Sequence, residues 1–277
     1  MPEPRHRSSG PVRAQAGTDD AAIQWVHQQS SLGALADLDY GITLLRALQS
    51  RVLTAPLVRL YRPSPTVAFG QRDVRLPGFE RARQASLAHG FTPVVRRAGG
   101  RAAAYHRGSL VVDHLQRDAD AVHGFRDRFA GFGELFAEVF RAAGVPAAVG
   151  EIPGEYCAGE YSVHAQRQRV PGAGGAVEAR GDIERGPVKL VGTAQRVVKG
   201  AWLFSSSLVV EDPEPIRAVL VDVYAALGLD WDPSTAGAAT EAQVDVTVEC
   251  IADGLRASYG TVVDRPWEDL LASVPAG

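Results

Sequence analysis

Apolar residues recur at helical spacing in several segments of the chain. From Leu35 to Leu48 they fall three or four residues apart, which is the repeat of an amphipathic helix packed on a sheet. The full segment predicts a helix over 35–53. The same criterion, with glycines as stop signals, predicts further helices over 81–89, 125–143, 214–227 and 244–259.

Shorter runs that are apolar or alternate between apolar and polar residues lie between these helices and predict strands. We expect strands at 57–61, 67–69, 92–96, 110–112, 147–149, 162–165, 188–192 and 202–210. Helices and strands therefore alternate along the chain, which is typical of an α/β (α+β) protein. With 277 residues, of which 45% are hydrophobic, the chain can bury one substantial core.

Two segments lack such patterns. Residues 1–30 open with a stretch rich in Pro, Arg, Ser and Gly, and we expect a disordered leader there, followed by one domain over 31–277. Residues 166–187 are rich in Gly, Arg and Pro and predict a long hairpin insertion. Fewer than fifty residues follow Asp230, too few for a separate accessory domain.

Charge and hydropathy exclude several classes of protein. The formal net charge of −3 provides no excess of positive charge with which to bind nucleic acid. No apolar run approaches the ~20 residues that cross a bilayer, and the first thirty residues lack the apolar centre of a signal peptide. We therefore expect a cytoplasmic protein with neither membrane nor nucleic-acid partners.

The chain has only two cysteines, too few for a disulfide framework. Cys250 falls on the predicted helix 244–259, and we expect it to be a small buried hydrophobe. Cys157 lies instead in a polar loop punctuated by glycines, where an inert buried thiol is the alternative to a reactive one.

Positive charge comes almost entirely from arginine, and the only lysines are Lys189 and Lys199. A lysine in such a chain suggests a need for a compact amine that can lose its proton. Lys189 begins the strand that pairs with the one after the Cys157 loop, so a thiol and an amine meet on one hairpin. Such a pair can move an acyl group between a thioester and an amide.

A second informative stretch, RRAGGRAAAYHRGS, carries the glycine pair Gly99 and Gly100 after a predicted strand. Paired glycines let the backbone approach a ligand closely and expose amide donors to it. An ordinary tight turn is the alternative. The stretch is not a Walker loop and lacks the dinucleotide-binding spacing.

Three pieces in this order, RRAGGRAAAYHRGS, GEYCAGEYS and KLVGTAQR, resemble the biotin/lipoate A/B protein ligase family. The resemblance spans about 35–259. It implies a single catalytic domain with a mostly antiparallel sheet and a tunnel for a medium-length acyl chain. It also implies attachment of lipoate, or its octanoyl precursor, to a lysine of a lipoyl domain, in the glycine cleavage H protein or the E2 subunit of a 2-oxoacid dehydrogenase. Acyl carrier protein is a possible donor.

Two chemistries occur in the family. Members that resemble lipoate-protein ligase A make an acyl-adenylate with ATP and Mg²⁺, and they have a Gly-Gly-Gly loop. Octanoyltransferase-like members have Gly-Gly-Arg and a nucleophilic cysteine, and they require no cofactor. Gly99, Gly100 and Arg101 follow the second pattern, and Cys157 stands where that cysteine is expected.

The resemblance implies catalytic roles for Cys157 and Lys189 and no metal ligands. It places the substrate beside Arg97, Gly99, Gly100, Arg101, Tyr105, His106, Gly192, Thr193, Ala194 and Gln195. This chain departs from the family where Tyr105 replaces a histidine, with His106 one place later.

Three hypotheses follow. An acyl-Cys157 thioester formed next to the Lys189 ammonium would make the chain an octanoyl or lipoyl transferase. An ATP-dependent lipoate ligase would make Cys157 incidental. A non-catalytic relative would bind acyl groups or lipoyl domains without turnover. A biotin ligase is disfavoured because that branch has a different glycine-rich signature.

Overall fold

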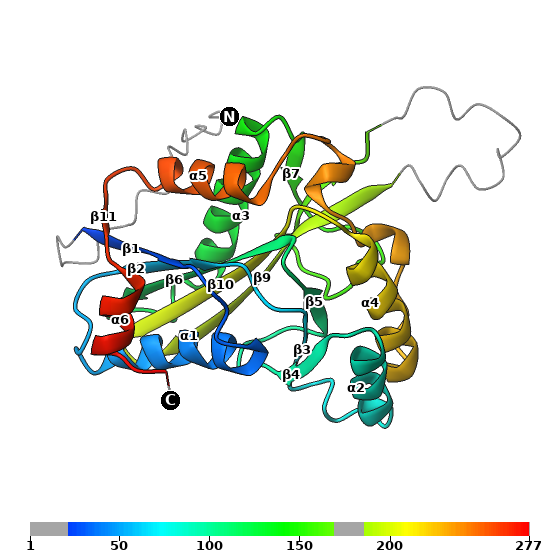
Figure 1. Ribbon diagram of the computed structural model, residues 1–277, viewed down its shortest axis with the longest axis horizontal. Coiled ribbons are helices and arrows are strands. Elements are labelled where there is room, and N and C mark those ends of the chain that lie inside the picture. The colour runs from blue at the N-terminus through cyan, green and yellow to red at the C-terminus, as the bar shows by residue number, and fades with distance from the viewer. Residues whose placement is uncertain (1–21, 169–185, 277) are drawn as a thin grey trace, which may run out of the picture.

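The computed structural model describes residues 22–168 and 186–276. In this part of the chain the strands form an eight-stranded sheet, in the order β11-β1-β2-β6-β10-β9-β8-β7, and a three-stranded sheet, β4-β3-β5 (Figure 1). The strands of the large sheet are β1 Ile23–Gln28, β2 Leu57–Tyr61, β6 Ser109–Arg117, β7 Ala147–Val149, β8 Val163–Gln166, β9 Pro187–Val198, β10 Ala201–Val209 and β11 Val262–Asp264. Those of the small sheet are β3 Thr66–Phe69, β4 Thr92–Val95 and β5 Ala103–Tyr105.

Most neighbouring strands are antiparallel. The pairs from β2 through β6, β10, β9 and β8 to β7 all run in opposite directions. Among the described strands, the parallel pairs are β1 with β2, β1 with β11, and β3 with β4. The predicted α/β (α+β) fold with a mostly antiparallel sheet flanked by helices is confirmed.

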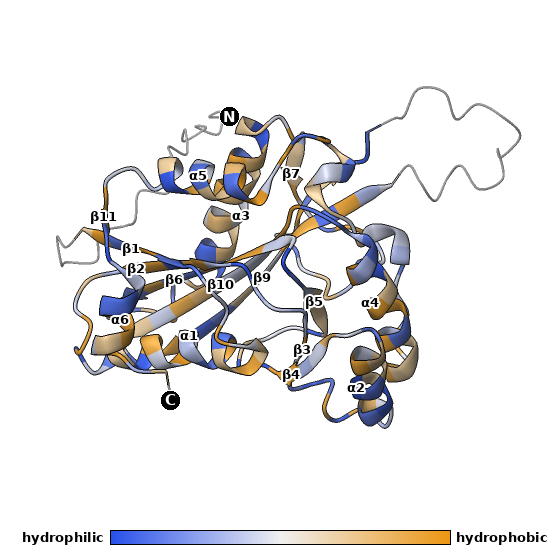
Figure 2. Cartoon of the chain, in the orientation of Figure 1, coloured by the Kyte–Doolittle hydropathy of each residue, from blue (hydrophilic) through white to orange (hydrophobic). Residues whose placement is uncertain are grey.

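Helices cover both faces of the large sheet (Figure 1). Their bounds are α1 Ala34–Gln49, α2 Phe79–Ala88, α3 Phe125–Ala142, α4 Glu214–Leu227, α5 Val248–Ser258 and α6 Trp267–Ser273, with short 3-10 turns at Pro233–Thr235 and Ala239–Glu241. Helices α1 and α6 lie on one face, α3 and α5 on the other, and α2 and α4 lie beside the small sheet. The helices mix hydrophilic and hydrophobic residues (Figure 2), as expected when one side of a helix packs on a sheet.

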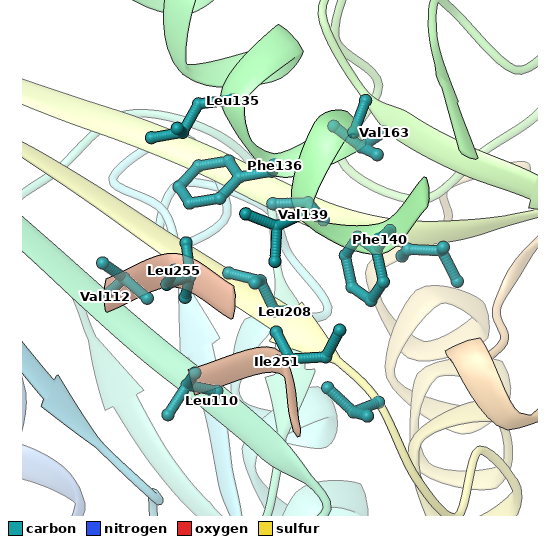
Figure 3. Packing of buried hydrophobic residues seen from close by; sticks show 14 of the residues in the cluster. Leu110, Val112, Leu135, Phe136, Val139, Phe140, Val163, Leu208, Ile251 and Leu255 are labelled. Atoms are coloured by element: carbon teal, nitrogen blue, oxygen red, sulfur yellow. The ribbon is translucent and has the colours of Figure 1, made fainter. Parts of the chain in front are cut away.

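The largest apolar core fills the space between the sheet and helices α3 and α5 (Figure 3). Phe136, Val139 and Phe140 of α3 meet Ile251 of α5 and the inward side chains of β6 and β10. The helical spacing at 125–143 therefore produces this layer. The packing holds the central strands, which carry the residues described below, in a fixed register.

Several predicted elements have the bounds that the sequence indicates, including β2, β7 and α4. Others differ. Strand β6 runs five residues beyond the predicted end at 112 to Arg117, because it is buried over most of its length between β2 and β10. Helix α5 begins at Val248 rather than 244, since the Thr247 side chain caps it by accepting from the Cys250 N–H at 3.1 Å. Strand β5, strand β11 and helix α6 are not predicted from the sequence.

Two predictions are wrong. The leader boundary at residue 30 is too late, because Ile23–Gln28 forms β1 and pairs with both β2 and β11. Residues 1–21 lie outside the described residues, as do residues 169–185 of the predicted insertion. Cys250 is exposed rather than buried, because the outer side of α5 faces solvent there.

Within the described ranges, no helix is both long enough and apolar enough to span a bilayer.

Candidate active site

Cys157 lies in the loop between β7 and β8, in a backbone conformation with φ of 45°. Its N–H donates to the Tyr224 hydroxyl at 2.9 Å, and that hydroxyl donates to the Ala102 carbonyl at 2.9 Å. Burial raises the pKa of Tyr224, so the hydroxyl keeps the proton that it donates. One side chain of α4 therefore ties the cysteine loop to the glycine-rich loop and holds Cys157 in an otherwise unfavourable conformation.

The half-buried thiol of Cys157 faces two donors from the glycine-rich loop. The Arg101 N–H lies 3.2 Å from Sγ, and a guanidinium nitrogen of Arg96 lies 3.6 Å from it. The same Arg96 nitrogen donates to the Arg101 carbonyl at 2.9 Å, which fixes its position. A guanidinium and an aligned amide are groups that stabilise negative charge on sulfur.

Gly100 allows this close approach. Its φ is 101°, and a Cβ built there would lie 2.9 Å from Cys157 Sγ and 2.4 Å from an Arg96 guanidinium nitrogen. Any larger residue would therefore push against the sulfur. Gly99 differs, because a Cβ there would meet no atom within 4 Å. The second glycine of the pair thus has a steric role at the thiol.

Lys189, on β9, points into the interior beneath the cysteine loop and is only 2% exposed. Its ammonium lies 2.9 Å from the Glu155 carboxylate and donates to the carbonyls of Tyr156 at 3.1 Å and Cys157 at 2.9 Å. The amine and the cysteine are therefore brought to one place, as the sequence predicts. The ammonium thus donates two hydrogen bonds to loop carbonyls, while the Glu155 carboxylate provides its counter-charge.

Glu155 is a functional candidate that sequence reasoning misses. Its second oxygen accepts from the Gly159 N–H at 3.1 Å and the Ser162 hydroxyl at 2.9 Å, so it fastens the start of the loop to its end. The sequence could have indicated Glu155, because a lysine that is buried beneath a loop requires a carboxylate partner nearby. Arg96 and Tyr224 are likewise missed, because their contacts join segments far apart in the chain.

A narrow cleft of about 50 Å³ runs from the glycine-rich loop along the face of the sheet under α1. Arg96 lines it and also contacts the thiol, so this one side chain links the cleft to Cys157. A Cβ at Gly192, on the floor, would lie 3.9 Å from Lys189 Cε. The cleft is lined by Leu38, Asp39, Ile42, Arg96, Arg97, Ala98, Tyr105, Val111, Asp113, Gly192, Ala194, Leu203, Ser205, Ser206 and Ser207.

Of the predicted binding residues, Arg97, Tyr105, Gly192 and Ala194 line this cleft. Gly99, Gly100 and Arg101 do not line it; they belong to the glycine-rich loop, in which Gly100 and the Arg101 N–H contact the thiol and the Arg101 guanidinium pairs with buried Asp73 at 3.1 Å.

The structure does not bring the remaining predicted residues to the cleft. Thr193 and Gln195 alternate with Gly192 and Ala194 along β9, so they point to the other face of the sheet. There Gln195 accepts from Arg128 at 3.0 Å and donates to the Phe125 carbonyl at 2.7 Å.

His106 is engaged elsewhere as well. One ring nitrogen accepts from the Gly108 N–H at 2.8 Å, and the other lies 2.9 Å from the Asp212 carbonyl. Both nitrogens therefore serve the turn before β6. For metals, the described ranges contain no group of three His, Cys, Asp or Glu residues placed to hold an ion.

The fold and the site define a catalytic domain of two sheets, in which a buried lysine lies beneath a cysteine loop and Arg96 links the cysteine to a narrow cleft. The model of the lipoyl protein ligase A/B catalytic domain matches residues 39–226, and the chain belongs to this family.

Curated relatives carry a more specific name. An octanoyl-[GcvH]:protein N-octanoyltransferase of Exiguobacterium sibiricum is 28% identical over 206 residues, which cover 73% of this chain and 67% of the relative. The enzyme of the same name from Geobacillus kaustophilus is 26% identical over 73% of this chain and 66% of its own length. The chain spans about two thirds of the length of these relatives.

Solved structures confirm the fold. Lipoate-protein ligase A bound with ATP superposes with a TM-score of 0.62 at 15% identity, covering 91% of this chain and 92% of that one. The bipartite lipoate protein ligase of Thermoplasma acidophilum, described with its E2 lipoyl domain, has a TM-score of 0.63 at 17% identity and covers 91% of each chain.

Proposed function

We propose that this protein transfers an octanoyl group to a lysine of a lipoyl domain through a thioester on Cys157. The observation that carries the proposal is the position of Cys157. Its sulfur lies 3.2 Å from the Arg101 N–H, and its backbone carbonyl accepts a hydrogen bond from the Lys189 ammonium. The names of the curated relatives support octanoyl as the group and the lipoyl protein GcvH as its donor. An E2 lipoyl domain or GcvH itself is the acceptor in this scheme.

The first step exchanges one acyl bond for another. The Cys157 thiolate attacks the octanoyl carbonyl, a C–S bond forms, and the bond between the acyl group and the donor lysine nitrogen breaks. That nitrogen leaves as an amine and needs a proton. The Lys189 ammonium, held beside the cysteine by Glu155, supplies it. Arg96 and the Arg101 N–H stabilise the negative charge on sulfur before the attack.

The second step reverses these roles. The acceptor lysine amine attacks the acyl-Cys157 carbonyl, a C–N bond forms, and the Cys157 thiolate leaves. The proton lost by the attacking amine returns to Lys189. Because Lys189 alternates between ammonium and amine, the scheme requires no cofactor. A reducing compartment such as the cytoplasm keeps Cys157 as a thiol.

Intact-mass analysis tests the proposal directly. The protein is mixed with octanoyl-GcvH, and in parallel with octanoyl acyl carrier protein, which is the alternative donor. We expect one octanoyl group to be gained from octanoyl-GcvH and to be absent in Cys157→Ala. A wild-type protein that gains no acyl group from either donor would refute a Cys157 thioester.

An ATP-dependent lipoate ligase is the second candidate. The observation in its favour is the pair of exposed guanidinium groups at the glycine-rich loop, where Arg196 donates to the Arg97 carbonyl at 3.4 Å. Such groups can receive phosphate. This candidate requires ATP with Mg²⁺ and predicts that lipoyl-AMP forms from lipoate and ATP equally well in Cys157→Ser.

A further inference from the structure

The turn that begins at Gly70, directly after β3, packs against the glycine-rich loop. A Cβ built at Gly70 would lie 1.9 Å from the Gly100 carbonyl oxygen, so any larger residue there would push the loop away. One residue further along the chain, the Gln71 side-chain amide donates to the Arg96 carbonyl at 3.2 Å. The turn thus supports the loop at two residues that lie against the Cys157 sulfur.

Asp73, in the same turn, provides a third point of support. Its side chain is fully buried, and each carboxylate oxygen has its own donor. The Gly70 N–H donates to one oxygen at 2.8 Å, and the Arg101 guanidinium donates to the other at 3.1 Å. The first bond closes the turn on itself. The second is a charge-assisted bond that fastens the turn to the glycine-rich loop.

Arg101 is thereby held at both ends of its residue. Its carbonyl accepts from Arg96 at 2.9 Å, and its guanidinium is held by Asp73. These two contacts orient its backbone N–H, which lies 3.2 Å from the Cys157 sulfur. A hydrogen bond weakens steeply when its donor turns away from the acceptor. The contact at the sulfur therefore depends on an aspartate that acts through Arg101.

We propose that Asp73 is a positioning residue for the reaction of Cys157. It holds the Arg101 guanidinium and so directs the Arg101 N–H at the sulfur, where this N–H stabilises the thiolate that attacks the acyl carbonyl. The inference rests on the proposed function, because it takes the Cys157 sulfur as the reacting atom. It assigns a role in the reaction to the turn between β3 and α2.

The charge of Asp73 and its positioning role have opposite effects on the thiolate. A carboxylate is negative, so its field alone disfavours a thiolate nearby. Asp73→Asn removes this charge and keeps one oxygen that can accept from the Gly70 N–H, but it turns an amide donor toward the Arg101 guanidinium. If only charge mattered, the thiolate would form at lower pH in this variant. If position dominates, the thiolate forms at higher pH.

The pH dependence of Cys157 alkylation by iodoacetamide distinguishes these effects, because the rate follows the thiolate fraction. Arg96, Lys189 and Glu155, the other charged groups around the cysteine loop, stay unchanged. We expect the midpoint of the Asp73→Asn profile to lie above the wild-type midpoint. The rate at neutral pH should fall about fivefold, since one hydrogen bond to a charged group is misaligned. A midpoint equal to or below that of the wild type would overturn the proposal.

A double variant removes the charge effect. Asp73→Asn with Arg101→Met takes away both charges together, so their fields at the sulfur largely cancel and no buried ion is left unpaired. We expect an upward shift of the midpoint here too, because the Arg101 N–H has lost its anchor. This variant decides the question if Asp73→Asn alone does not fold. A wild-type midpoint in the double variant would contradict the proposal.

Glu241→Gln is the matched control. The Glu241 carboxylate accepts from a backbone N–H, that of Ala238, and from the Arg217 guanidinium, both at 3.0 Å. It therefore makes the same two kinds of contact as Asp73, with residues outside the glycine-rich loop. We expect its alkylation profile to match the wild type even where its urea midpoint falls. An equal shift of the profile in this variant would assign the effect to lost stability and overturn the proposal.

Alkylation and acyl transfer are separate measurements. If octanoyl-GcvH acylates Cys157 but Asp73→Asn leaves the alkylation profile unchanged, the positioning proposal fails and the transferase proposal stands. If the profile shifts as expected but no acyl-Cys157 forms, Asp73 positions the thiol as proposed, while the transfer chemistry is wrong.

Discussion

The Lys189 ammonium lies 2.9 Å from the Glu155 carboxylate, and both side chains are almost completely removed from solvent. The pair connects strand β9 to the loop that carries Cys157. Its position explains why one strand lysine can organise a loop more than thirty residues earlier in the chain.

Glu155→Gln should destabilise the protein by about 3–5 kcal/mol, because it leaves a buried ammonium without its counter-charge. Urea unfolding followed by fluorescence measures the change. We also expect octanoyl transfer to fall sharply, since the neutral amide no longer holds the Lys189 side chain in position beneath the cysteine loop. Glu160→Gln, which removes an exposed partner of Arg126, is the matched control and should leave the urea midpoint unchanged. Equal midpoints for the two variants would contradict the proposed role of Glu155.

Gly100→Ala should abolish or strongly slow Cys157 acylation, because the new methyl group would lie 2.9 Å from the sulfur. The positive φ adds strain of roughly 1–3 kcal/mol. Mass spectrometry of the acyl adduct and thermal unfolding measure the two effects. Gly99→Ala is the control, since open space surrounds that position. If both alanine variants acylate at the wild-type rate, the glycine loop does not shape the thiol site.

Arg96→Gln should slow alkylation of Cys157 by iodoacetamide at neutral pH by about tenfold, because the guanidinium near the sulfur is lost. Exposed Cys250 provides an internal reference within the same molecule, and its rate should not change. Peptide mapping after timed quenching separates the two cysteines. A parallel change at both thiols would indicate a global effect instead.

Stability should fall as the pH drops below about 6.5, because burial lowers the pKa of His114 to about 3. The unfolded chain then binds a proton that the folded protein excludes, and the loss is about 1.4 kcal/mol per pH unit below the unfolded pKa. His164, whose pKa burial also lowers, acts in the same direction. Urea midpoints at pH 7.5, 6 and 5 measure the trend. His114→Gln should flatten it, and an unchanged slope would assign the effect to other groups.

The sequence predicts much of the scaffold because its helices have clear apolar faces. It misses β1, where Gln24, His27 and Gln28 interrupt the apolar pattern although the strand lies between β2 and β11. The sequence also predicts that Cys157 and Lys189 lie close together, since both flank one hairpin, and the structure places the Lys189 ammonium against the Cys157 carbonyl.

The sequence predicts the residues of the site less well than the scaffold, for a different reason. The family motif KLVGTAQR is read along the chain, whereas a strand sends alternate side chains to opposite faces. Gly192 and Ala194 therefore border the cleft while Gln195 holds α3. The position of Asp113 in the cleft could not be found from sequence, because it depends on cross-strand neighbours that are distant in the chain.

The parallel pairing of β1 with β11 joins residues 23–25 to residues 262–264. During synthesis on the ribosome, the outer edge of β1 therefore stays open until almost the whole chain has emerged. An open edge invites pairing with other strands. We therefore expect nascent chains truncated before residue 262 to aggregate, even though every residue of the thiol site has already been made.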